Sequence, residues 1–204
     1  MSNWSGKYVI GLTGNIATGK SVVRKMLEHL GAYGIDADAL AHRAIEKGAP
    51  GYRPVLDTFG QWIVQKDGQI DRTKLAQLAF SDADALTQLE AILHPLVEQA
   101  VDILIKRSTQ SIIVIEAIKL LEGKLASACD SIWVADAPVH IQSARLVEKR
   151  NMIEKNAMQR IQSQNLQTDK VAAANVVIKN TSSFEDLWKQ VSVAWNKEFS
   201  IEAE

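Results

Sequence analysis

The chain has 204 residues, with 23 basic and 24 acidic side chains and a net charge of −1. Because the charges form no long runs, composition favours neither a nucleic-acid nor a membrane partner. Cys129 is the only cysteine, which excludes a disulfide framework and suits a reducing cytoplasm. The apolar runs are too short for a signal segment or a membrane span, so we expect a cytoplasmic protein that is a monomer or a weak homo-oligomer.

The first elements form a phosphate-binding pattern. Tyr8–Leu12 predicts a short buried strand, and apolar side chains at helical spacing follow from Val22 onward. Between them the chain reads G-x-x-x-x-G-K-S, the phosphate-binding loop (P-loop) of nucleotide-binding proteins. Its glycines let the backbone amides approach phosphates at the positive end of the next helix. We therefore predict that ATP, accompanied by Mg²⁺, binds to Gly14, Asn15, Ile16, Ala17, Thr18, Gly19, Lys20, Ser21 and Val22.

Two residues of this loop have distinct chemical roles. Lys20 is expected to reach the β- and γ-phosphates, and the hydroxyl of Ser21 is expected to bind the metal ion.

The second predicted strand, Ala32–Asp36, ends in the sequence Asp36-Ala37-Asp38. Ligands of open α/β sheets bind at the carboxyl ends of strands. One carboxylate would point into the cleft, as a general base for an alcohol or towards Mg²⁺ through water, while the other caps the helix that begins near Ala39. In the alternative interpretation both are caps or solvated loop residues.

A long helical block lies between Asp36 and Ser111, and we interpret it as an inserted subdomain. Its last part predicts two amphipathic helices, Ala83–Leu93 and Leu96–Ile105, separated at His94-Pro95.

Three more strands are predicted at Ser111–Glu116, Ser131–Ala135 and Asn175–Lys179. The alternation of strands and helices predicts an α/β fold, with a parallel sheet flanked by helices. The last helix is expected to start at a Ser182 or Ser183 cap and to run to about Trp195.

A basic segment, 145–164, predicts two helices joined near Asn151. Arginines there would close over the transferring phosphate, exclude water and offset transition-state charge. The alternative is a solvated helix face. The basic residues are Arg145, Lys149, Arg150, Lys155 and Arg160.

Together these motifs resemble the dephospho-coenzyme A kinase family. The resemblance rests on the P-loop, Asp36-Ala37-Asp38, Leu93-His94-Pro95-Leu96, Arg145-Leu146 followed by Arg160-Ile161 and Gln164, and Val176-Val177-Ile178 with Asn180. It implies transfer of the γ-phosphoryl of ATP to the 3′-hydroxyl of dephospho-coenzyme A, the final step of coenzyme A biosynthesis. It also implies a single P-loop kinase domain over 1–204, with an acceptor-binding helical subdomain at 40–100 and a helical lid at 140–168.

The resemblance implies roles for individual residues. Lys20, Asp38 and Arg150 would be catalytic, with Asp38 as the base. Arg145 and Asn180 would contact ATP, and Glu116 is a further candidate for the metal. The acceptor site would comprise Asp36, Asp38, His94, Leu121 and Glu122. For His94 a second role stays open, which is to cap and orient the two helices that it separates.

The chain also departs from the family pattern. Lys119 stands in a segment where family members commonly have proline, which affects the expected acceptor contacts of Leu121 and Glu122. The spacing from Arg145 to Arg150 is one residue longer than usual, so Lys149 is an alternative phosphate ligand.

Asn15 and Ala17 replace common glycines, and the loop tolerates them if their φ angles are negative. The alternative function is another small-molecule P-loop kinase, such as a nucleoside monophosphate kinase, which would share the core and the lid.

Overall fold

A computed structural model describes residues 4–200, apart from the side chain of Phe80. The chain forms two compact units. Among the described residues, one unit consists of 4–35 together with 108–200, and the other spans Asp36–Arg107. No helix in the described part is long and apolar enough to cross a membrane.

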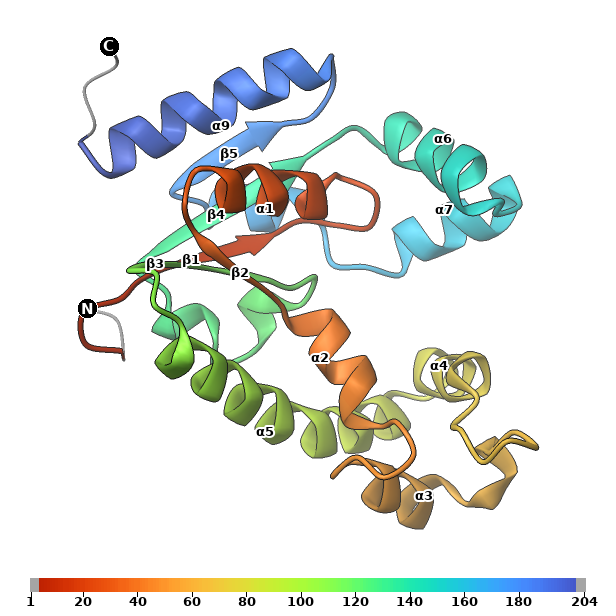
Figure 1. The fold of residues 1–204 in the computed structure, drawn as a ribbon. Helices are drawn as coiled ribbons and strands as arrows, with labels where there is room; N and C mark the ends of the chain where they lie inside the picture. Colours follow the sequence, from red (N-terminus) through yellow and green to blue (C-terminus); the bar gives the residue numbers. More distant parts are fainter. Residues whose placement is uncertain (1–3, 201–204) are drawn as a thin grey trace. The chain divides into compact units, whose positions relative to one another are not determined.

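The first unit is built on a five-stranded parallel sheet with the order β2-β3-β1-β4-β5 (Figure 1). Leu12 of β1 pairs with Glu116 of β3 on one side and with Trp133 of β4 on the other, so β1 is central. All five predicted strands are confirmed to within a residue at either end. They are β1 (Tyr8–Thr13), β2 (Tyr33–Asp36), β3 (Ile112–Glu116), β4 (Ser131–Asp136) and β5 (Val176–Lys179).

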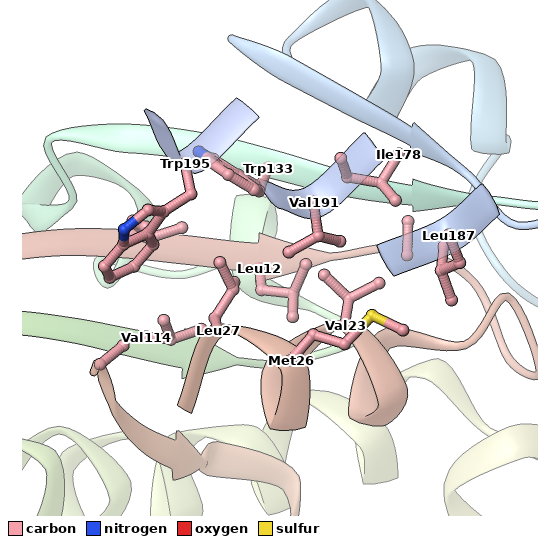
Figure 2. Close-up of a cluster of buried hydrophobic side chains, with 13 residues drawn as sticks. Leu12, Val23, Met26, Leu27, Val114, Trp133, Ile178, Leu187, Val191 and Trp195 are labelled. Atoms are coloured by element: carbon pink, nitrogen blue, oxygen red, sulfur yellow. The ribbon is translucent and has the colours of Figure 1, made fainter. Parts of the chain in front are cut away.

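Helices α1 (Lys20–His29) and α9 (Phe184–Glu198) pack against one face of this sheet. Figure 2 shows their apolar side chains, among them Leu27 and Val191, meeting Leu12 and Trp133 of the central strands. Ser183 caps α9 by accepting a hydrogen bond from the amide of Asp186, as the sequence predicts. Burial of this cluster fixes the strand and the helix that flank the P-loop.

The opposite face of β1 is closely covered at Gly11. A Cβ at this position would lie 2.7 Å from Leu120 Cδ2 and 2.8 Å from Cys129 Sγ. Both residues belong to the connection between β3 and β4, which contains the short helices η2 (Leu120–Glu122) and η3 (Ala126–Ala128).

Three helices connect β4 to β5. They are α6 (Val139–Arg150), α7 (Glu154–Gln162) and α8 (Gln167–Ala172). Asn151 ends α6 in the left-handed conformation with φ of 49°, which confirms the predicted junction. Leu146 and Ile161 pack with Ile16 in a small apolar cluster, so α6 and α7 are anchored on the P-loop.

The second unit is helical, with its own core of Ile45, Val55, Leu56, Ile63, Ile70 and Leu75. Its elements are α2 (Ala37–Ala44), α3 (Tyr52–Phe59), η1 (Gln61–Ile63), α4 (Arg72–Ser81) and α5 (Ala83–Arg107). The unit contains the block 40–100. Its role in acceptor binding stays a prediction.

The expected break at His94-Pro95 is wrong, because α5 is one helix of 25 residues with Pro95 inside it. Proline removes one hydrogen bond and crowds the preceding turn. Apolar side chains at a spacing of four nevertheless continue along the helix on both sides of this point, and their burial keeps the helix continuous. They are Ala85, Leu89, Leu93, Val97, Val101 and Ile105.

Candidate active site

The P-loop joins β1 to α1, and two of its glycines are required by its shape. Gly14 has φ of 142° and Gly19 has φ of 99°. A Cβ at Gly14 would lie 2.3 Å from the carbonyl oxygen of Ala135, and one at Gly19 would lie 1.9 Å from Nδ2 of Asn180. Both the backbone conformation and the space therefore exclude larger residues.

From the sequence, a negative φ angle is expected at Ala17. The observed φ is 60°, so this expectation is wrong. A left-handed conformation costs an L-residue with a Cβ about 1 kcal/mol or more. Surrounding contacts must hold the loop in this shape, because local sequence preference opposes it.

Lys20 is the first residue of α1 and is 6 % exposed. Its Nζ lies 3.2 Å from the carbonyl oxygen of Asn15, so the side chain folds back over the loop. The ammonium group and the amides at the start of α1 thus lie together, and their combined positive charge suits an anion.

Ser21 and Glu116 bring oxygen ligands together beside the loop. Ser21 Oγ donates to Glu116 Oε1 at 2.7 Å, and Arg24 Nε donates to Glu116 Oε2 at 2.8 Å. Glu116 ends β3 and is 4 % exposed. A hydroxyl and a carboxylate are hard donors that Mg²⁺ accepts alongside phosphate oxygens, so these residues fit the ion.

Arg145 binds the back of the loop. Its NH1 donates to the carbonyl oxygens of Ala17 at 3.0 Å and Thr18 at 3.4 Å. Its NH2 donates to the backbone oxygen of Asn180 at 3.0 Å and to Oδ1 of the same residue at 2.9 Å. Burial lowers the pKa of the Arg145 guanidinium from its ordinary value.

Asn180 follows β5 and completes this arrangement, since its Nδ2 donates to the carbonyl oxygen of Thr18 at 2.9 Å. The structure therefore brings both predicted ATP ligands, Arg145 and Asn180, to the loop. The contacts they make there are with loop carbonyls, and contact with ATP stays a prediction.

Lys149 and Arg150 are exposed in the last turn of α6. At about 100° per residue, Lys149 lies about 40° around the helix from Arg145, whereas Arg150 lies about 140° from it. Helix geometry thus places Lys149 on the side of α6 that carries Arg145. The catalytic role of Arg150 stays a prediction.

The polar side chains of the segment after β3 bind to other groups of the protein. Glu122 Oε1 accepts from Asn165 Nδ2 at 2.8 Å, and Lys119 Nζ lies 3.6 Å from Glu122 Oε2. Leu121 is half-buried in η2. Lys119 therefore pairs with Glu122, and the predicted acceptor contacts of Leu121 and Glu122 stay predictions.

The remaining candidates lie in the helical unit. Asp36 is the N-cap of α2, and its Oδ1 accepts from the amide of Ala39 at 2.8 Å, as one interpretation of the sequence predicts. Asp38 lies in the first turn of α2 and is half-buried. His94 is exposed within α5, so it does not cap two helices and the acceptor role is the prediction left for it.

Sequence reasoning missed Arg24 and Gln167. Arg24 lies one turn after Lys20 and reads from sequence as an ordinary helix residue, yet its guanidinium bridges Glu116 and Glu28. Gln167 accepts from the amide of Asn15 at 2.8 Å. The Arg24–Glu116 and Gln167–Asn15 contacts have no local sequence signal, because each joins distant parts of the chain.

The order of the strands, with the P-loop between the central strand and α1, defines a P-loop kinase fold. A sequence profile described as dephospho-CoA kinase matches residues 8–186. The dephospho-CoA kinase of Carboxydothermus hydrogenoformans is 40 % identical over 186 residues, covering 90 % of each chain. The chain belongs to the dephospho-CoA kinase family.

Solved structures share this fold. A crystal structure of the Thermus thermophilus protein TT1252 is 29 % identical with a TM-score of 0.83, covering 97 % of this chain and 99 % of that one. Dephospho-CoA kinase from Campylobacter jejuni shares the fold, with a TM-score of 0.65, 24 % identity and coverage of 96 % and 100 %. The fold class expected from the sequence is therefore confirmed.

Proposed function

We propose that the protein transfers the γ-phosphoryl group of ATP to the 3′-hydroxyl of dephospho-coenzyme A, giving coenzyme A and ADP. The observation that carries this proposal is the P-loop with buried Lys20 at its end and the Ser21–Glu116 pair beside it. Membership of the dephospho-CoA kinase family supports the identity of the acceptor.

The triphosphate would lie against the amides at the start of α1. Lys20 would bind the β- and γ-phosphates, and its charge would stabilise the transition state more than the ground state. Ser21 and Glu116 would hold Mg²⁺, which supplies neutralisation of phosphate charge when it is bound.

The acceptor would bind to the helical block 40–100, which contains His94. Asp36, Leu121 and Glu122, which lie outside that block, would be its other contacts. Asp38 would take the proton from the 3′-hydroxyl as its oxygen attacks the γ-phosphorus. The bond from the γ-phosphorus to the bridging oxygen then breaks, and ADP leaves. Asp38 would release the proton to solvent.

The segment 140–168 would act as a lid that excludes water from the reaction. Lys149 or Arg150 would place a positive charge near the γ-phosphate, while Arg145 holds the loop. We also propose a cytoplasmic enzyme, consistent with a single cysteine.

Incubation of the purified protein with Mg²⁺-ATP and one acceptor, followed by mass analysis of the products, tests the proposal. The acceptors are dephospho-coenzyme A, adenosine monophosphate and water. We expect coenzyme A from the first mixture and no comparable ADP formation in the other two. Lys20→Ala is the matched inactive control.

Rapid ADP formation with adenosine monophosphate, without coenzyme A from the first mixture, would contradict the acceptor and favour a nucleotide kinase. Normal turnover by Lys20→Ala would contradict the assignment of the P-loop.

A further inference from the structure

Two glutamines, Gln164 after α7 and Gln167 at the start of α8, bind backbone amides of the P-loop. Gln164 Oε1 accepts from the amide of Ile16 at 2.7 Å, and Gln167 Oε1 accepts from the amide of Asn15 at 2.8 Å. Asn15 Nδ2 also donates to the carbonyl oxygen of Asn165 at 3.0 Å. Three hydrogen bonds therefore join loop residues 15 and 16 to residues that are about 150 positions later in the chain.

Gln167 also connects the loop to the sheet. Its Nε2 donates to the carbonyl oxygen of Ala135 and to Asp136 Oδ1, both at 3.1 Å. The same carbonyl of Ala135 is the closest atom to a Cβ built at Gly14. One side chain thus fixes the separation between the start of the loop and the end of β4.

These bonds occupy two of the backbone amides of the loop. The amides of Asn15 and Ile16 face the glutamines, and the next residue is Ala17 in its unfavourable left-handed conformation. Arg145 donates to the carbonyl oxygens of Ala17 and Thr18, and Asn180 also donates to that of Thr18. Hydrogen bonds therefore hold Ala17 and the residues before and after it, as conformations of this kind require.

Glutamine suits these two positions because its side-chain amide carries no charge. A carboxylate would accept the same amide hydrogen bonds, but it would place a negative charge beside a bound triphosphate. A neutral amide holds the loop without that repulsion.

We propose that Gln164 and Gln167 are positioning residues that preorganise the P-loop for nucleotide binding. Nucleotide affinity then depends on the segment 163–167. This inference rests on the proposed ATP site, but it does not depend on the identity of the acceptor.

The test measures ADP binding to the full-length protein by calorimetry, together with hydrogen exchange of the loop amides, well below the melting temperature. We expect Gln164→Met, which removes one hydrogen bond to a loop amide, to weaken ADP binding by about 3- to 10-fold. Gln167→Met removes three hydrogen bonds and should weaken ADP binding at least as much. Exchange at Ile16 and Asn15, respectively, should accelerate in the absence of ADP.

Gln162→Met is the matched control, because Gln162 is exposed at the end of α7. It should leave ADP affinity and loop exchange unchanged. In turnover assays, Gln164→Met should raise KM for ATP while kcat and KM for the acceptor change less than twofold.

Gln164→Glu provides a second variant if Gln164→Met does not fold. It keeps the acceptor oxygen, so the amide of Ile16 should stay protected while the added charge weakens ADP binding. Unchanged ADP affinity in both folded methionine variants would overturn the proposal, as would faster exchange at Ile16 in folded Gln164→Glu with ADP affinity unchanged. Failure of the unaltered protein to bind ADP would instead contradict the proposed function.

Discussion

Replacement of Arg145 by alanine should destabilise the protein even when no nucleotide is present. The guanidinium donates to four acceptors, on Ala17, Thr18 and Asn180, at 2.9–3.4 Å. Hydrogen bonds to charged groups contribute about 1.5–3 kcal/mol each when well formed. The four contacts come from two nitrogens, and water can reach the half-buried site, so we expect a loss of about 2–4 kcal/mol in the free energy of unfolding.

Urea denaturation without nucleotide, followed by tryptophan fluorescence, measures this loss. Arg145→Lys should lose about half as much, because one ammonium group cannot reach both sets of acceptors. Lys155→Ala is the control, since Lys155 is exposed on α7 and its change should stay within about 0.5 kcal/mol. If Arg145→Ala also stayed within about 0.5 kcal/mol of the unaltered protein, Arg145 would not hold the loop.

Other variants test the remaining roles. Asp38→Asn should lower kcat by about 10²- to 10⁴-fold with little change in ATP affinity, and a loss confined to ATP binding would contradict its role as base. Lys149→Ala should lower kcat more than Arg150→Ala, because Lys149 lies on the side of α6 that carries Arg145, and the reverse order would assign that role to Arg150. Ala17→Gly should raise the free energy of unfolding in urea by about 0.5–1 kcal/mol by relieving its left-handed strain, and a decrease would contradict that strain. Burial raises the pKa of the Cys129 thiol to about 12, so the folded protein should react with a disulfide reagent at about pH 8 far more slowly than the urea-unfolded chain. Because the unfolded thiol loses its proton first, this group's contribution to stability is present below about pH 9 and is lost as the pH rises towards 12, which alkaline denaturation of Cys129→Ala would check.

Local sequence signals predicted the sheet and the P-loop. Strands β1 and β3 are short apolar runs that lie buried on both faces, and such runs are recognisable without knowledge of their neighbours. Gly14 and Gly19 were predictable for the same reason, since the loop needs backbone conformations that glycine adopts most easily. The N-caps at Asp36 and Ser183 also follow from residues within one turn.

The course of α5 could not be predicted from its local sequence. Pro95 favours a break, and the apolar stripe favours continuity. Packing of that stripe decided the outcome, because tertiary contacts contribute most of the stability of a helix in a folded protein.

By itself, the sequence determined the order of the elements, the phosphate-binding loop and the family resemblance. Only the tertiary structure decided which side chains hold that loop. Gln164 and Gln167 reach it from about 150 residues away, and Glu116 meets Ser21 across 95 positions. Such contacts depend on how the strands and helices pack. The periodicity and spacing of residues in a single sequence do not show which distant side chains will meet.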